Sequence, residues 1–164
     1  MDANRVTNVI IAGLGGQGVL KASDILAETV FQAGFDVKKS EVHGMSQRGG
    51  SVCSDVRFGK TVFSPMVPPG EADYLVVLAA DQVEPNRSML RSGGMLIHPG
   101  LVDAGRLANR KSFNVALLGV LSHHLSIPEA FWLAAIRTHL PEKVQAVNHQ
   151  AFTLGRSVAS LPGD

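Results

Sequence analysis

The sequence predicts an α/β fold, a three-layer α/β/α domain whose mixed, mostly parallel sheet is Rossmann-like. Three observations predict it. The β-branched, apolar run at residues 6–12 is typical of a buried parallel strand. A glycine-rich turn, a helical run and another strand-like run follow it, and together they indicate a βαβ unit. Further strand-like runs then give way to a C-terminal third with helical patterns.

The first helix is predicted over residues 17–33, because apolar side chains recur there at spacings of three and four. Gly34 is expected to end this helix as a C-terminal cap, and residues 37–42 to form the next strand. The apolar stripe of the helix comprises Val19, Ala22, Leu26, Val30 and Ala33.

Residues 51–58 alternate in character, as the residues of a half-buried strand do. The two-residue connection Gly59-Lys60 leads from them to residues 61–63 and predicts a β-hairpin, whose antiparallel strands would make the sheet mixed. Residues 64–70 contain three prolines and are expected to be irregular.

The second half of the chain is predicted to contain two more strands and then mainly helices. The expected elements are strands at 74–80 and 95–98, a short helix at 85–91, and helices at 113–125, at 126–140 and from Pro141 onwards. Ser126 and Glu129 have the spacing of a capping box for the middle helix of the last three. Residues 101–112 show no periodicity that predicts an element.

The composition fits one globular domain that spans residues 1–164, with 45% hydrophobic and 18% charged residues. Fifteen basic and 14 acidic residues leave a net charge of +1 without a basic block, which argues against a nucleic-acid partner. There is no apolar run of membrane-spanning length and no leader, so we expect a cytoplasmic protein without a membrane partner. The single cysteine, Cys53, excludes an internal disulfide and a cysteine-ligated iron–sulfur cluster built by this chain alone.

The glycine-rich turn between the first strand and the first helix matches Gly-x-Gly-x-x-Gly. In this context the first glycine makes the turn, the second lets backbone approach a phosphate, and the helix N-terminus presents free N–H groups to an anion. A tight turn with a purely structural role is the alternative. The cofactor-binding candidates in this turn are Gly13, Gly15, Gly16, Gln17 and Gly18.

A second candidate region is the polar segment at residues 40–50, which combines a carboxylate, an imidazole, a hydroxyl, an amide and a guanidinium with three glycines. These groups suit an anionic ligand or a partner surface better than a ribose diol, and a solvated loop is the alternative. The candidates here are Glu41, His43, Ser46, Gln47 and Arg48.

The sequence contains no complete catalytic set. Its six histidines show no paired metal-ligand spacing, so we predict no metal site. Cys53 has no basic neighbour in sequence and is expected to be a buried, small apolar residue. The chain is therefore predicted to bind rather than to catalyse on its own.

Residues 10–20 and 40–52 closely resemble the gamma subunit or domain of 2-oxoacid:ferredoxin oxidoreductases, in particular the small (beta) subunit of the indolepyruvate type. Further matching pieces are residues 55–59, 64–65 with 70–73, 114–119 and 140–155, so the resemblance covers nearly the whole chain.

The resemblance implies an α/β/α subunit of an enzyme that oxidatively decarboxylates a 2-oxoacid to an acyl-coenzyme A and passes electrons to ferredoxin. It implies that thiamine diphosphate and iron–sulfur clusters lie in a large catalytic partner, that coenzyme A has access near this chain, and that ferredoxin is an indirect partner. A homo-oligomer remains open, as does the choice of 2-oxoacid.

One departure from the family is the short segment at residues 99–113, where members usually carry about a strand pair more. It puts the usual assembly and the preference for aryl pyruvates in question. Two other functions stay open at this point: a stand-alone nucleotide- or coenzyme A-binding or regulatory module, and a nicotinamide-dependent oxidoreductase, which the missing catalytic set disfavours.

Overall fold

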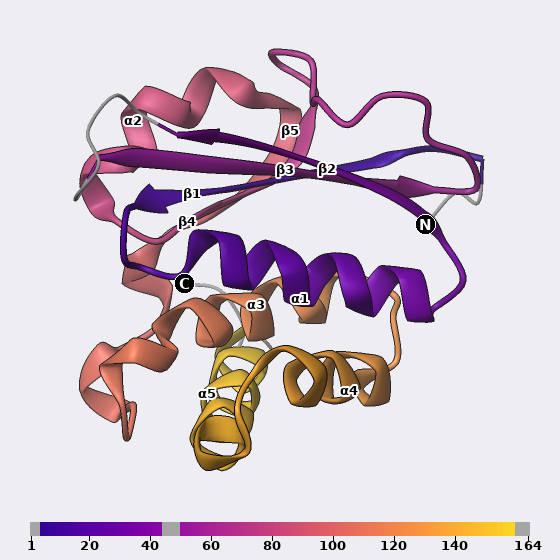
Figure 1. The fold of residues 1–164 in the computed structure, drawn as a ribbon. Helices are drawn as coiled ribbons and strands as arrows, with labels where there is room; N and C mark the ends of the chain where they lie inside the picture. Colours follow the sequence, from indigo (N-terminus) through magenta and orange to yellow (C-terminus); the bar gives the residue numbers. More distant parts are fainter. Residues whose placement is uncertain (1–3, 44–49, 160–164) are drawn as a thin grey trace.

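The structure is a computed structural model that describes residues 4–43 and 50–159. Its centre is a five-stranded sheet with the strand order β2-β3-β1-β4-β5 (Figure 1). The pairs β1–β4 and β4–β5 are parallel, whereas β3 runs antiparallel to both β1 and β2. The predicted mixed, mostly parallel sheet is thereby confirmed. The strands are β1 (Thr7–Leu14), β2 (Asp36–His43), β3 (Ser51–Gly59), β4 (Ala72–Val77) and β5 (Leu90–Ile97).

Helices flank the sheet on both faces, as the predicted three-layer architecture requires (Figure 1). On one face α1 and α3 lie against the strands, α4 packs on α1, and α5 packs on α3. The other face carries the short α2 with its adjoining 3₁₀ turns and the loop that follows β3. The helices are α1 (Val19–Gln32), α2 (Val83–Asn86), α3 (Phe113–His124), α4 (Glu129–His139) and α5 (Glu142–Ala159).

Two apolar clusters fill the space on the two faces of the sheet. Successive residues of β1 enter opposite clusters, with Val9 and Ile11 in the larger one and Ile10 and Ala12 in the smaller one. This alternation follows from the two-residue period of a strand, and it explains why all of β1 is apolar. Every residue of α3 from Asn114 to Ser122 is buried, because the sheet lies on one side of this helix and α5 on the other.

The crossing of α3 and α5 depends on two glycines. A Cβ atom on Gly119 would overlap the carbonyl oxygen of Phe152, and one on Gly155 would overlap the carbonyl oxygen of Ala116. The two backbones therefore approach more closely than any other residue pair would allow, and this contact fixes α3 in its place beside the sheet.

The predicted hairpin between residues 51–58 and 61–63 is wrong. Both edges of β3 are already paired, one with β2 and the other with β1, so no edge remains for a further strand. Residues 61–63 instead begin a loop, in which the Val62 N–H donates to Asp36 Oδ2 at 2.7 Å. The parallel βαβ unit is present, but β3 lies between β1 and β2.

Two further local predictions fail because of prolines. The capping box is wrong, since α4 begins at Glu129 with Pro128 as its N-cap and no side-chain cap. Pro128 disfavours a helical conformation at Ile127, so Ser126 stays outside the helix. The helix expected at 85–91 is also displaced, because helical structure begins at Ala80 and ends at Met89. Proline has no backbone N–H, so it is tolerated anywhere in the first turn of a helix, where the N–H groups have no intrahelical acceptor. Pro85 therefore lies within the first turn of α2 and not at its first residue.

Several boundaries agree with the sequence analysis. Gly34 directly follows the C-cap of α1 with a φ of 96°, the left-handed conformation that a terminating glycine adopts. Residues 101–112 hold no strand or α-helix and contain 3₁₀ turns at Ala104–Arg106 and Arg110–Ser112. In the described part of the chain, no helix has the length and apolar character to cross a bilayer.

Candidate functional site

The glycine-rich turn joins the end of β1 to the start of α1. Gly16 and Gly18 have φ values of 87° and 84°, a region that side chains other than glycine's disfavour. Gln17 closes the turn from inside, because its backbone N–H donates to the Leu14 carbonyl at 3.1 Å and its Oε1 accepts from the Leu14 N–H at 2.7 Å. A Cβ on Gly13 would crowd this Oε1 atom at 2.9 Å. The sequence-predicted residues of the turn therefore form one compact unit.

The N-termini of α1 and α3 meet at Gly18. This residue is the N-cap of α1 and offers no side-chain cap. Its carbonyl accepts from Ala22 N at 2.9 Å and from Asn114 Nδ2 at 3.1 Å. A Cβ on Gly18 would overlap the Asn114 amide. The first N–H groups of α1 lack intrahelical acceptors, so its positive end faces this region. At α3 the Phe113 N–H donates to the Arg110 carbonyl, and the Val115 N–H donates to Asn114 Oδ1.

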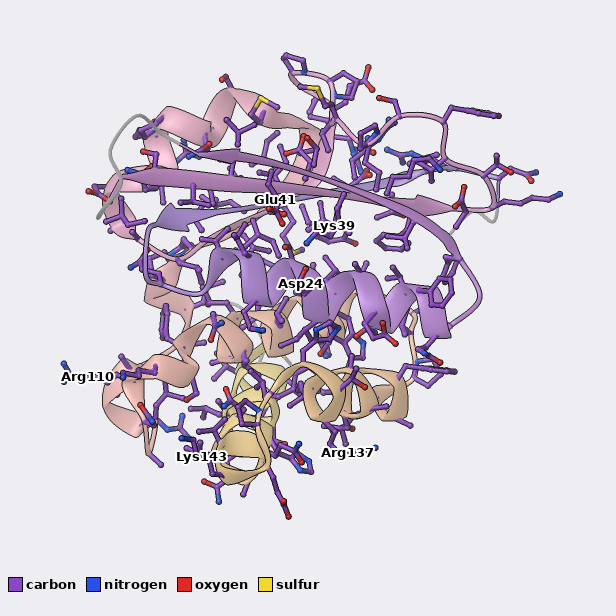
Figure 2. All side chains as sticks on the ribbon, in the orientation of Figure 1. Asp24, Lys39, Glu41, Arg110, Arg137 and Lys143 are labelled. Carbon is purple, nitrogen blue, oxygen red and sulfur yellow. The ribbon has the colours of Figure 1, made fainter. Side chains whose placement is uncertain are left out.

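A pocket of about 460 Å³ lies beside this junction, and we call it the basic pocket. Two cations from the 3₁₀ turn before α3, Arg110 and Lys111, border it, and both are exposed. Neither side chain forms an ion pair with any residue that the structure describes. Figure 2 shows Arg110 at the end of the helical layer, with its side chain directed outward. The basic pocket is lined by Gly16, Gln17, Gly18, Leu78, Arg110, Lys111 and Phe113.

A second pocket, of about 380 Å³, lies on the other side of the same turn, and we call it the apolar pocket. Its side chains are aliphatic except for Lys21, which is exposed. Gly16 and Gly18 line both pockets, so the glycine turn forms the ridge between them. The apolar pocket is lined by Leu14, Gly15, Gly16, Gly18, Val19, Leu20, Lys21 and Val52.

Both pockets lie at the carboxyl edge of the parallel strands. From β1 the chain passes into α1 on one face of the sheet, and from β4 it passes into α2 on the other face (Figure 1). Adjacent parallel strands whose connections leave on opposite faces create a topological switch point, where open α/β sheets bind their ligands. The Leu78 N–H donates to the Ala12 carbonyl at 2.8 Å and closes the sheet directly below this point.

Of the second candidate region, Glu41 does not line either pocket. It bonds Lys39 Nζ at 3.0 Å, and Lys39 also pairs with Asp24 of α1 (Figure 2). Burial opposes the charge of Lys39, but the bonds to Asp24 and Glu41 outweigh it and raise the pKa of the ammonium group. Glu41 is thus engaged in attaching β2 to α1.

His43 is the last residue of β2, whereas Ser46, Gln47 and Arg48 lie outside the described residues. The chain returns at Gly50, whose carbonyl accepts from the Gly15 N–H at 2.8 Å. The end of the polar segment and the glycine turn are therefore in direct contact.

Cys53 is half-buried against the smaller apolar cluster, as an apolar residue would be. Its thiol contacts Asn86 Oδ1 at 3.2 Å. Burial, and secondarily Asp55, raises the pKa of this thiol, so it is a poor nucleophile and metal ligand at neutral pH. No cluster of histidine, cysteine and carboxylate side chains suited to a metal occurs among the described residues.

Sequence reasoning missed Arg110 and Lys111. They lie in the stretch for which no element was predicted, and exposed basic residues alone carry no signal. Their position directly before the helix that begins at Phe113 was a usable signal. Cations at a helix N-terminus interact unfavourably with the helix dipole, so stabilisation of the helix does not explain why they are there.

The fold and this turn define a class: an α/β domain that presents a glycine-rich turn at the switch point of its sheet. The chain belongs to the pyruvate ferredoxin/flavodoxin oxidoreductase family, whose profile matches residues 8–158. The predicted membership of the 2-oxoacid:ferredoxin oxidoreductases is thereby confirmed.

One relative is the indolepyruvate oxidoreductase subunit IorB of Thermococcus kodakarensis, which is 36% identical over 194 aligned positions that cover 93% of this chain and 95% of that protein. Because those positions outnumber the 164 residues of this chain, the relative carries residues that this chain lacks.

Solved structures share the fold. The chain matches the gamma subunit of a keto/oxoacid ferredoxin oxidoreductase from Geobacter sulfurreducens with a TM-score of 0.78 and 19% identity, over 94% of this chain and 97% of that one. It matches the 2-oxoglutarate:ferredoxin oxidoreductase of Magnetococcus marinus, solved with 2-oxoglutarate, coenzyme A and succinyl-CoA bound, with a TM-score of 0.84 and 19% identity, over 98% of this chain and 32% of that one.

Proposed function

We propose that this chain is the small, non-thiamine subunit of an indolepyruvate-type 2-oxoacid:ferredoxin oxidoreductase. It would support the oxidative decarboxylation of an aryl pyruvate to an acyl-coenzyme A, with the electrons passed to ferredoxin in the cytoplasm. The observation that carries this proposal is the similarity to IorB, which extends over nearly the full length of both chains.

Within this function, the glycine turn is proposed to bind a phosphate of coenzyme A. Three features support it: the left-handed glycines that leave the backbone open, the N-terminus of α1, and the unpaired cations of the basic pocket. The polar segment, with His43, Ser46, Gln47 and Arg48, is proposed to complete the site, since its end contacts the turn through Gly50.

The remaining cofactors are assigned to a large catalytic partner. The donor set of this chain does not fit an iron–sulfur cluster, because its single cysteine has a raised pKa and lies half-buried on a strand. Thiamine diphosphate would need a divalent metal, and no group of three or more histidine, cysteine or carboxylate side chains suited to one occurs among the described residues. The chain therefore supplies binding surface, and the partner supplies the redox chemistry.

A tagged pull-down from an anaerobic native extract tests this proposal. We expect a large chain that contains iron and thiamine diphosphate to co-elute, together with aryl pyruvate-dependent reduction of ferredoxin. A chain that elutes alone and gains no activity on addition of coenzyme A would instead favour a free-standing coenzyme A- or nucleotide-binding module. Activity on a different 2-oxoacid in the eluate would keep the subunit assignment and correct the substrate.

A further inference from the structure

The loop at residues 61–70, which we call the proline loop, presents apolar side chains to solvent from a backbone that the sheet holds in place. We propose that this loop is the docking surface for the large catalytic chain and that it inserts into an apolar cleft of that partner. The inference rests on the proposed function, because that function supplies the partner chain.

Two side chains of the proline loop lie outside the apolar clusters. Phe63 and Met66 are 92% and 59% exposed, and neither belongs to a cluster of the described residues. Val62 and Val67 of the same loop are buried, so the loop does bury apolar side chains where the fold needs them. No residue from 61 to 70 is charged. Exposed apolar groups that include aromatic and methionine side chains are typical of the centre of a protein–protein interface.

The backbone of the proline loop is fixed before any partner binds. The Val67 N–H donates to Asp55 Oδ2, and Arg57 Nη1 donates to the Ser64 carbonyl, both at 2.8 Å. Three prolines restrict the backbone further, since each fixes its own φ. A loop that is already ordered loses little conformational entropy on association, so more of the free energy gained by burying its apolar side chains appears as affinity.

The proline loop lies on the less covered face of the sheet. The four longer helices occupy the other face, with α1 and α3 against the strands and α4 and α5 behind them (Figure 1). Val42 of β2 adds an exposed apolar side chain on the face of the loop, because Cys53 opposite it in β3 packs against the smaller cluster. The apolar surface available to a partner on this face therefore includes the loop and the edge strand.

The longer chain of a structural relative indicates which partner covers this domain. The same fold makes up 32% of the Magnetococcus marinus chain, so most of that polypeptide is further structure joined to it. IorB carries no such remainder, because its similarity to this chain extends over 95% of its own length. A subunit of the IorB type therefore makes the corresponding contacts with a separate polypeptide, which is the large catalytic chain of the proposed function.

A projecting apolar loop fits a cleft better than it fits a second copy of itself. A side chain as exposed as Phe63 stands out from the surface of the chain. Two projecting loops related by a twofold axis meet over a small area, whereas a stable interface buries about 800 Å² on each partner. A cleft encloses the loop from several sides and reaches such an area more easily.

The charges at the two ends of the proline loop define the rim of this cleft. Lys60 precedes the loop and Glu71 follows it, and both residues are exposed. Neither side chain forms an ion pair with a residue that the structure describes. The partner is therefore expected to carry a carboxylate near Lys60 and a cation near Glu71.

The test replaces the chain in its source cells by tagged variants and repeats the anaerobic pull-down. The amount of large chain retained per tagged chain is measured from iron, thiamine diphosphate and gel band intensity. In Phe63→Asp we expect this amount to fall about tenfold or more, because a charged group would then enter the apolar cleft. Met66→Asp should have a smaller effect in the same direction, since less of its side chain is exposed.

The matched control is Phe31→Asp. Phe31 is 61% exposed and lies on α1, on the opposite side of the sheet, so this variant makes the same chemical change away from the proline loop. It should retain the large chain like the parent. Thermal unfolding of each purified chain checks that the variants fold, and Phe63→Asp should unfold close to the parent because the side chain is exposed.

A charge reversal tests the rim. Lys60→Glu should weaken retention at low salt, and the loss should shrink as sodium chloride is raised, because exposed charges are screened. The control is Lys143→Glu on the outer helix α5, where the side chain is exposed (Figure 2), and it should leave retention unchanged. A loss that does not depend on salt, or an equal loss in both variants, would overturn the carboxylate assigned to the rim.

The outcomes separate this inference from the function on which it rests. If the parent retains the large chain and Phe63→Asp retains as much, the docking surface is overturned and the proposed function stands. The same holds if Phe31→Asp and Phe63→Asp lose the large chain equally, or if Phe63→Asp only converts a dimer of this chain to a monomer in sedimentation. If the parent retains no large chain, the proposed function fails and this inference fails with it.

Discussion

The two ends of the sheet each carry a pair of cationic side chains, and the two pairs differ in what surrounds them. At the amino edge, Arg5 and Arg91 each bond Asp73 Oδ1 at 2.7 Å, while the other oxygen of this carboxylate accepts from the Asn8 N–H at 2.8 Å. Asp73 is buried, with 7% of its surface exposed. At the carboxyl edge, Arg110 and Lys111 have no carboxylate partner among the described residues.

This difference separates a charge cluster whose partners all lie within the protein from two cations that are left free for the proposed ligand. Asp73 is a buried carboxylate that accepts three bonds from groups of the protein, so the amino-edge cluster is complete without a ligand. The carboxyl-edge cations are exposed, border the basic pocket and lie directly before the N-terminus of α3. The proposed phosphate site rests on this arrangement.

The largest expected effect is at the amino edge. Replacing Asp73 by Ala would leave two arginines without their acceptor and one N–H of β1 unpaired, and we expect a loss of about 3 kcal/mol of unfolding free energy. The exposed parts of both arginines limit the loss. Urea unfolding measures it. Arg110→Ala/Lys111→Ala, the comparison variant, should stay within about 0.5 kcal/mol of the parent. Equal losses of unfolding free energy in the two variants would show that the cations at both ends of the sheet contribute equally to stability, which contradicts the comparison.

The next effect concerns the ridge at the carboxyl edge. Gly18→Ala would force a left-handed conformation on alanine and displace the Asn114 amide from the Gly18 carbonyl. We expect a loss of about 2 kcal/mol, from the conformational strain and one hydrogen bond. Thermal unfolding checks this value. Gly16→Ala is the control, because it has a similar φ but no overlapping atom, and it should cost less. A smaller loss in Gly18→Ala than in Gly16→Ala would contradict the packing argument.

A pH-dependent effect is expected between the two ends, at Asp55. Burial raises the pKa of this carboxyl, although the Val67 N–H and Arg57 oppose the shift. The folded state therefore binds the proton more tightly than the unfolded state, so this contribution to stability is full below pH 3.8 and is lost as the pH rises through the raised pKa. Asp55→Asn should remove this trend. Unfolding of both proteins from pH 3.5 to pH 7 measures it, and parallel curves would exclude it.

The smallest effect on stability is expected at Phe63, in the loop that leaves the amino edge after β3. Its side chain is 92% exposed and makes no contribution to either apolar cluster. Phe63→Ser should change the unfolding free energy by less than about 0.5 kcal/mol. By contrast, Val67→Ser removes a buried side chain from the same loop and should destabilise the chain clearly. Equal losses of unfolding free energy in the two variants would contradict the burial of Val67 against the sheet.

Much of the fold could be predicted from local pattern. The buried strand at residues 6–12, the amphipathic helix after it and the terminating Gly34 each depend on nearby residues only, and each is present. The hairpin at residues 61–63 could not be judged locally, because its absence depends on β2 occupying the outer edge of β3. Proline effects at Ile127 and Pro85 were open to local reasoning and were overlooked.

The candidate site divides in the same way. The glycine turn could be predicted from the sequence, because the spacing of its glycines and the strand and helix patterns on either side of it are adjacent in the chain. Arg110 and Lys111 lie some 90 residues further on, and only the packing of Asn114 against Gly18 brings them to the turn. Glu41 shows the opposite case: its sequence position suggested a ligand, but a lysine two residues earlier on the same strand occupies it. The roles proposed for the other residues of the polar segment remain predictions.

The bond from the Gly15 N–H to the Gly50 carbonyl has a consequence for spectroscopy. An amide proton exchanges with solvent only when its hydrogen bond opens, so the exchange rate of this one proton reports how often the end of the polar segment leaves the glycine turn. Gly15 is itself exposed, so little else shields the proton. The exchange rate of this one amide proton therefore measures how often the contact between the two candidate binding regions opens. A ligand that contacts both regions would lower that rate.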